Sequence, residues 1–188
     1  MKTDTNSLQN DEQPIEYGTF GLRLGALFID SLLILPFILF ENLYNIPYLK
    51  SELLLSVVFI FALLYKPFTE YYFGATVGKM ILRLKVVNSQ LNKPTWKEIL
   101  FRNIFHITPI IIGFSVAFIT FSQPEFSNIT SFREYSILEK HYLNFAYQFI
   151  SFAVILTDSL FLLIDKKCRA LHDRIARTFI IRKPKNSK

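Results

Sequence analysis

The 188-residue sequence has a single cysteine and no sign of a secretory leader. Cys168 has no second cysteine in the chain to pair with, which excludes a scaffold held by internal disulfides. Residues 1–20 are polar and mildly acidic, and no basic segment leads into an apolar run, so we expect a solvated tail. Only 19% of the residues are charged, whereas 51% are hydrophobic and the mean hydropathy is +0.30. This composition excludes disorder for most of the chain.

Four long apolar stretches follow the polar tail. They cover residues 24–40, 53–65, 104–121 and 142–164. A helix that crosses a bilayer needs about 20 mainly apolar residues, and only the second stretch is short by this measure. A soluble helical bundle would show alternating polar faces, which these stretches lack. We therefore predict an all-α membrane protein in the lipid bilayer, with four transmembrane helices over about residues 22–41, 51–72, 99–121 and 142–165.

The basic residues indicate how this chain is oriented. Seven lie between the second and third stretches, nine follow the fourth, and two lie at the amino end, whereas the other two connections hold only Lys50, Arg133 and Lys140. The positive-inside rule then places both termini in the cytoplasm, and we expect a multi-pass protein of a bacterial inner membrane. The net charge of +6 does not indicate nucleic-acid binding, because the charges are dispersed and follow no binding-module pattern.

The connection over residues 73–98 predicts a small structured cap. Residues 81–87 alternate between apolar and basic side chains, which favours a strand. Thr95 and Glu98 have the spacing of a capping box that opens the third long helix. Residues 178–182 predict a second strand. We expect the two strands to pair in a β/helical cap on the cytoplasmic side.

Several ionisable side chains interrupt the apolar stretches, at a cost of about 2.5–3.5 kcal/mol each, so each needs a partner or a role. Arg23 and Asp30 are seven residues apart on the first helix, and Asp158 and Asp165 have the same spacing on the fourth. Seven residues make about two helical turns. Because these helices run in opposite directions, Arg23 lies level with Asp165, and Asp30 with Asp158. With His106 in the third helix, they predict a charge cluster in the cytoplasmic half of the membrane.

Two interpretations of this cluster stay open. In the first, Asp30 and Asp158 form a carboxylate pair that exchanges a proton for a cation. Arg23 and His106 would then tune the pair. In the second, Arg23 forms an ion pair with Asp165 or Asp30, and the charges only fix the packing of the helices. The sequence contains no recognisable nucleophile–base pair or metal-ligand set, so we expect neither an enzyme, nor a metal site, nor a cofactor.

Two shorter motifs have structural interpretations. Gly74 and Gly78-Lys79 resemble part of a phosphate-binding loop, but the spacing is one residue short and Met80 follows, so we reject a nucleotide site. His172-Asp173 follows the fourth helix and reads as a capping pair of a C-terminal helix.

Three segments together resemble the RDD family of small membrane proteins, which is named for one arginine and two aspartates. They are residues 23–30 (RLGALFID), 74–87 (GATVGK followed by LKVV) and 171–178 (LHDRIART). The resemblance spans roughly residues 17–182 and implies that the named residues are Arg23, Asp30 and Asp173. The chain departs from the family pattern at Arg83 and Arg177, where glycine is usual.

The resemblance also implies an organisation and a function. A membrane domain at residues 21–182 would lie between the polar tail, 1–20, and a basic tail, 183–188. A secondary carrier or monovalent cation/proton exchanger with Asp30 at its centre is the first hypothesis. The alternative is a non-transporting protein that assembles or regulates a partner complex, which the small size favours unless the chain forms a homo-oligomer. Arg23 and Asp173 are expected to form a salt bridge that closes the cytoplasmic mouth of the cluster.

Overall fold

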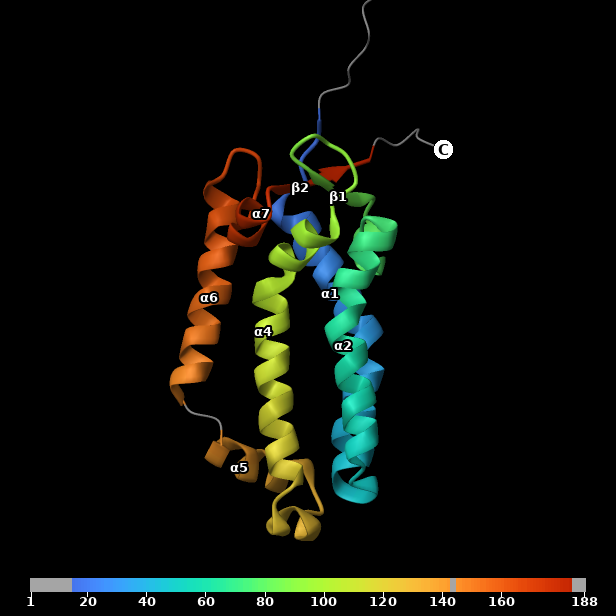
Figure 1. Ribbon diagram of the computed structural model, residues 1–188, viewed down its shortest axis with the longest axis vertical. Coiled ribbons are helices and arrows are strands. Elements are labelled where there is room, and N and C mark those ends of the chain that lie inside the picture. Colours follow the sequence, from blue (N-terminus) through green and yellow to red (C-terminus); the bar gives the residue numbers. More distant parts are fainter. Residues whose placement is uncertain (1–14, 143–144, 184–188) are drawn as a thin grey trace, which may run out of the picture.

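Long helices run side by side through most of the molecule, and a small cap covers one end (Figure 1). The computed structural model describes residues 15–142 and 145–183. The long helices are α1 (Phe20–Phe40), which continues into the π-helix η1 (Glu41–Leu49), α2 (Glu52–Phe73), α4 (Trp96–Phe121) and α6 (Phe145–Ile164). The shorter elements are α3 (Val77–Ile81), β1 (Leu84–Asn88), η2 (Pro124–Asn128), α5 (Phe132–Tyr142), α7 (Leu171–Ile175) and β2 (Thr178–Arg182).

Within the described residues, three helical segments are long and apolar enough to cross a membrane. They are Phe20–Leu49, Glu52–Ile81 and Trp96–Phe121. The predicted fourth helix, 142–165, begins later than expected, because Tyr142 ends α5 and α6 begins at Phe145; residues 143–144 lie outside the described part. That α6 crosses the membrane stays a prediction.

Local signals in the sequence explain where α2 begins and ends and where α4 begins. Ser51 precedes α2, and its hydroxyl accepts a hydrogen bond from the backbone N–H of Leu54. Gly74 ends α2 in the left-handed conformation, with φ at +75°. The predicted capping box of Thr95 and Glu98 is present at the start of α4, which therefore begins at Trp96, three residues before the predicted position.

The two predicted strands pair in the cap. β1 and β2 are antiparallel, with Leu84 opposite Arg182 and Val86 opposite Ile180. The first strand begins later than the predicted residue 81, because Ile81 is the last residue of α3. Leu84, Val86 and Ile180 are buried and pack together with Ala26 of α1 and Ile99 of α4. The sheet is therefore fixed onto the ends of the long helices; its location in the cytoplasm stays a prediction.

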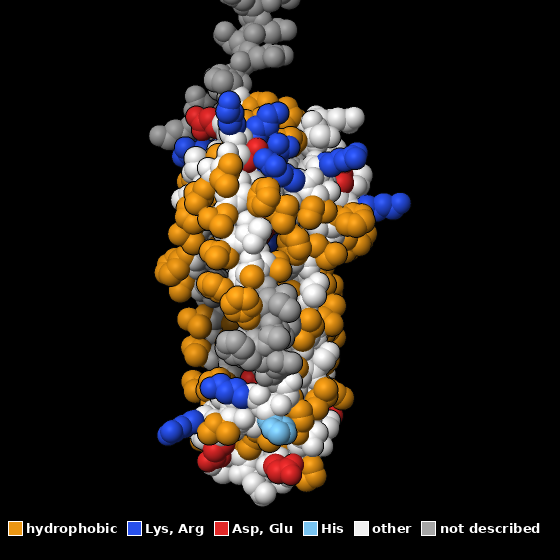
Figure 2. Space-filling model, turned by 90° about the vertical axis from the view of Figure 1, so that its left-hand side faces the viewer, with side chains coloured by type: hydrophobic (Ala, Val, Ile, Leu, Met, Phe, Trp, Pro, Cys, Tyr) orange, Lys and Arg blue, Asp and Glu red, His pale blue; other side chains and the backbone are white. Residues whose placement is uncertain are grey.

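Apolar side chains cover much of the long helices on the outside. Figure 2 shows them along the middle of the molecule, with many of the Lys and Arg side chains of this face at the cap end. Leu53 is 71% exposed, Phe28 64% and Leu27 62%. So much exposed apolar surface is unfavourable in water and is typical of helices that contact lipid.

Candidate functional site

A continuous chain of ion pairs lies beneath the cap. Arg23 Nη1 donates to Asp173 Oδ2 at 2.5 Å. Arg102 Nη1 donates to the other oxygen of Asp173, and Arg102 Nε lies 3.2 Å from Glu70 Oε2. Glu70 Oε1 accepts a hydrogen bond from Lys79 Nζ. The expected Arg23–Asp173 salt bridge is thus present, as one link of a chain that joins α1, α7, α4, α2 and α3.

Uncharged groups form further hydrogen bonds with the residues of this chain of ion pairs. Arg23 Nε donates to the carbonyl oxygen of Gly18 at 2.9 Å, and Arg102 Nη1 donates to Thr178 Oγ1 at 3.0 Å. Asp173 accepts a hydrogen bond from the backbone N–H of Ala170 at the start of α7. Asp173 is therefore a cap, as its position predicted, and an ion-pair partner as well. Buried charges are tolerated only when they are paired and hydrogen-bonded in this way.

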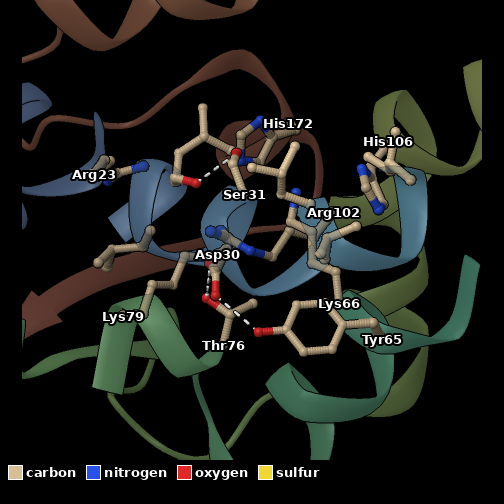
Figure 3. Close-up of a pocket in the computed structure, with 15 residues that line it drawn as sticks. Arg23, Asp30, Ser31, Tyr65, Lys66, Thr76, Lys79, Arg102, His106 and His172 are labelled. Atoms are coloured by element: carbon tan, nitrogen blue, oxygen red, sulfur yellow. Dashed lines mark hydrogen bonds between the residues drawn. The ribbon is translucent and has the colours of Figure 1, made fainter. Parts of the chain in front are cut away.

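Asp30 is held differently. The residue is only 9% exposed, and its carboxylate accepts hydrogen bonds from Tyr65 Oη at 2.8 Å and Thr76 Oγ1 at 2.6 Å (Figure 3). The backbone N–H of Gly78 donates a third, at 2.8 Å. All three donors are neutral. In the described part of the chain, Asp30 takes part in no ion pair, in contrast to Glu70 and Asp173.

The close approach of α3 to α1 produces this arrangement. A Cβ atom at Gly78 would lie 2.1 Å from the carbonyl oxygen of Ala26 and 3.1 Å from Asp30 Cγ, so only glycine fits. The motif that resembled a phosphate-binding loop is thus explained without a nucleotide. Gly74 ends α2, Gly78 allows the helices to touch, and Lys79 forms an ion pair with Glu70.

The structure does not contain the carboxylate pair predicted for Asp30 and Asp158. Asp158 Oδ1 accepts a hydrogen bond from the backbone N–H of His172 at 2.9 Å, and Asp158 Oδ2 lies 2.7 Å from His172 Nδ1. Helical spacing had given the height of both carboxylates along their helices, but not the direction in which each points. α7 supplies the partner of Asp158 instead.

Asp165 also has partners other than the predicted one. Its carboxylate forms ion pairs with Arg169 at 2.8 Å and Arg174 at 2.9 Å, both from the segment that follows α6. Arg23 binds Asp173 and pairs with neither Asp165 nor Asp30. Both partners that the sequence left open for Arg23 were therefore wrong. The chain turns back after α6, and Asp173 of α7 binds Arg23 instead.

A cavity of about 430 Å³ lies beside these groups, between α1, α2, α3, α4 and α7. Three of the predicted site residues, Arg23, Asp30 and His106, line it, and the Nε2 atom of His106 is buried without a hydrogen-bond partner in the described structure. Sequence reasoning had not assigned the other polar residues of the lining to the site. These are Ser31, Tyr65, Lys66, Thr76, Lys79, Arg102 and His172.

One signal could have placed Arg102 inside the protein. Arg102 and Asn103 follow the buried Ile99 by three and four residues, so all three lie on one helical face. We missed this signal because Arg102 and Lys79 were counted only as charges of a cytoplasmic loop. For Tyr65 and Thr76 the sequence offers no comparable signal, since their contact with Asp30 spans 35 and 46 residues. Within the described residues, no group of three or more His, Cys, Asp or Glu is placed to hold a metal ion.

His172 is expected to make stability depend on pH. Burial lowers its pKa to about 4 from the usual 6.5, and the hydrogen bond that His172 donates to the Asp158 carboxylate only partly offsets this. As the pH falls, the unfolded chain therefore takes up the proton before the folded protein does. The stability that neutral His172 contributes is complete above about pH 6.5 and is lost as the pH falls toward 4. We expect a loss on the order of 2 kcal/mol over this range.

Thermal unfolding between pH 7 and pH 4 measures this effect. The variant His172→Gln should show a shallower decline than the unchanged protein, and the exposed His141 supplies the control His141→Gln. Equal slopes for all three proteins would contradict the assignment to His172.

The apolar helices and the ionic cluster buried at one end of them define an α-helical membrane protein. The chain belongs to the RDD family, whose model matches residues 17–177. No match was found among curated proteins or among solved structures.

Proposed function

We propose that this membrane protein is a secondary carrier that exchanges a proton for a monovalent cation at the cavity beneath the cap. The observation that supports this is the bonding of Asp30, a buried carboxylate with only neutral donors that lines the cavity. Glu70 and Asp173 are neutralised by arginine and lysine and hold the helices together. The charge of Asp30 is therefore the one that a proton or a small cation would neutralise.

The groups around Asp30 suit both ligands. A proton on the carboxylate removes the cost of a buried charge. A small hard cation prefers oxygen ligands, and the hydroxyl oxygens of Tyr65 and Thr76 already lie within hydrogen-bond distance of the carboxylate. Each hydroxyl is both a donor and an acceptor, so it can turn its lone pairs toward a cation when the proton has left. The positive-inside pattern of the basic residues supports a cytoplasmic location for this exchange.

Transport in proteoliposomes tests the proposal. A gradient of Na⁺ or K⁺ across vesicles that contain the full chain is expected to drive proton flux, which a pH-sensitive dye inside the vesicles reports. Asp30→Asn should reduce this flux to that of protein-free vesicles, because the neutral amide cannot exchange a charge. Asp165→Asn is the matched control, since its carboxylate forms ion pairs outside the cavity.

The control should retain the flux. Absence of cation-driven flux from folded protein, checked by its elution as a single species and by its thermal transition, would refute the exchanger.

A second function is favoured by the chain of ion pairs itself. Arg23, Asp173, Arg102 and Glu70 satisfy one another, as a structural lock would, and Asp30 lies outside this chain of pairs. A non-transporting protein that assembles or regulates a partner membrane complex needs such a lock and no exchange site. Folded protein without flux for any common ion, recovered from its native membrane with a reproducible partner, would support this alternative.

A further inference from the structure

The charges that line the cavity are unbalanced. Arg23, Lys66, Lys79 and Arg102 line it, whereas Asp30 is the one carboxylate of the lining. Three of the four cations form ion pairs with Asp173 or Glu70. Lys66 is different, because its Nζ atom has no ion pair or hydrogen bond with any described residue. Among the cationic side chains of the cavity, Lys66 is therefore the one that makes no direct ion pair or hydrogen bond within the described residues.

A second polar atom without a partner lies in the same cavity. His106 Nε2 is buried and makes no hydrogen bond within the described residues. Lys66 belongs to α2 and His106 to α4, and both side chains line the cavity (Figure 3). An unsatisfied buried polar atom costs about 1–3 kcal/mol, so a ligand with an anionic group for Lys66 Nζ and a hydroxyl for His106 Nε2 would be favoured. The carboxylates of Glu70, Asp30 and Asp158 act electrostatically on Lys66, but each of them accepts hydrogen bonds from other donors.

The apolar part of the lining indicates where such a ligand comes from. Leu27, Leu35 and Ile38 of α1 line the cavity and are 62%, 42% and 46% exposed. On a helix that crosses a membrane, side chains this exposed contact lipid. The cavity thus has cationic groups at one part of its wall and lipid-contacting side chains at another. An amphiphile with an anionic head and an apolar tail matches both.

We propose that the cavity binds the headgroup of an anionic phospholipid, with its phosphate on Lys66 Nζ, a headgroup hydroxyl that donates to His106 Nε2, and an acyl chain along Leu27, Leu35 and Ile38. The phosphate supplies the direct ion pair that Lys66 lacks within the described residues. Its hydrogen bond to an ammonium group is charge-assisted and therefore stronger than one between neutral groups. This inference goes beyond the exchange at Asp30, since a lipid bound here is a partner of the protein whether or not ions are transported.

Lipid selectivity in vesicles tests the proposal. The full chain is reconstituted in phosphatidylcholine that contains a small fraction of spin-labelled phosphatidylglycerol, and the motionally restricted fraction of the label is measured. We expect restricted phosphatidylglycerol in excess over labelled phosphatidylcholine, with about tenfold weaker binding in Lys66→Gln, because one charge-assisted hydrogen bond is lost. Lys66→Arg keeps the charge and should retain most of the binding. Lys97→Gln, at an exposed position outside the cavity, is the matched control and should bind normally.

Each other outcome argues against the proposal. Unchanged selectivity in folded Lys66→Gln, or an equal loss in Lys97→Gln, would overturn it. Inorganic phosphate that displaces the labelled lipid would show that the cavity takes a soluble anion, which overturns the lipid assignment. The measurement requires no ion gradient, so it reports lipid binding whether or not the protein exchanges ions. Failure of the exchanger and failure of the lipid site are therefore separate results.

Discussion

Replacing Arg102 with methionine is expected to cost about 3–5 kcal/mol of stability, because it leaves two buried carboxylates without their shared cation. Arg102 is 2% exposed and bonds to both Glu70 and Asp173. Methionine has a similar length but no charge, so the packing of α4 changes little while the electrostatic balance is lost. The apparent free energy of unfolding in detergent micelles, or the thermal transition in the same detergent, measures the effect.

Arg174→Met is the matched control for this prediction. Arg174 also forms an ion pair with an aspartate, but its side chain is 40% exposed, and such pairs contribute about 0–1 kcal/mol. A double-mutant cycle sharpens the test. Asp173→Asn combined with Arg102→Met should cost clearly less than the sum of the two single changes, because the second change removes a charge that the first left unpaired. Additive effects would mean that the two side chains are not coupled.

Gly78→Ala is expected to destabilise the protein by about 3 kcal/mol and to disrupt the Asp30 site, because the added methyl group cannot be accommodated. Its Cβ would lie 2.1 Å from the carbonyl oxygen of Ala26, and backbone cannot move aside as a flexible side chain can. Separation of α3 from α1 would also break the hydrogen bond from Gly78 N–H to Asp30. Thermal unfolding reports the first effect and cation-driven proton flux the second.

The same substitution elsewhere provides the control. A Cβ at Gly21 of α1 would meet no other atom within 4 Å. Gly21→Ala should therefore be neutral or stabilising by up to about 1 kcal/mol, since alanine favours the helical conformation over glycine. A Gly78→Ala protein as stable as Gly21→Ala would contradict the close packing of α3 on α1.

Much of the local structure follows from the order of residues along the chain. The capping box of Thr95 and Glu98 and the strand at residues 178–182 were predicted because they depend on neighbours within a few positions. The apolar stretches gave the long helices for the same reason. The beginning of α6 was misplaced, since the apolar pattern continues from the end of α5 and periodicity alone does not mark the break.

The partners of the charged side chains were harder to predict. Spacing along α1 and α6 gave Arg23, Asp30, Asp158 and Asp165 their relative heights, and all four are indeed held by specific contacts. Asp30 and Asp158 nevertheless have separate hydrogen-bond partners, because a height does not fix the direction of a side chain. The Arg23–Asp173 salt bridge was anticipated from a family resemblance, which carries information about tertiary contacts that spacing lacks.

The sequence by itself determined that the protein is helical, apolar and asymmetric in charge, since hydrophobic content and charge distribution are properties of a linear chain. The tertiary structure alone decided which charges neutralise one another. It placed Lys79 and Arg102 in a buried network although both had been counted as loop charges, and it left Asp30 with neutral donors and Lys66 with no described partner. The physical reason is that electrostatic energy in a buried site depends on distances of a few ångströms between residues far apart in sequence.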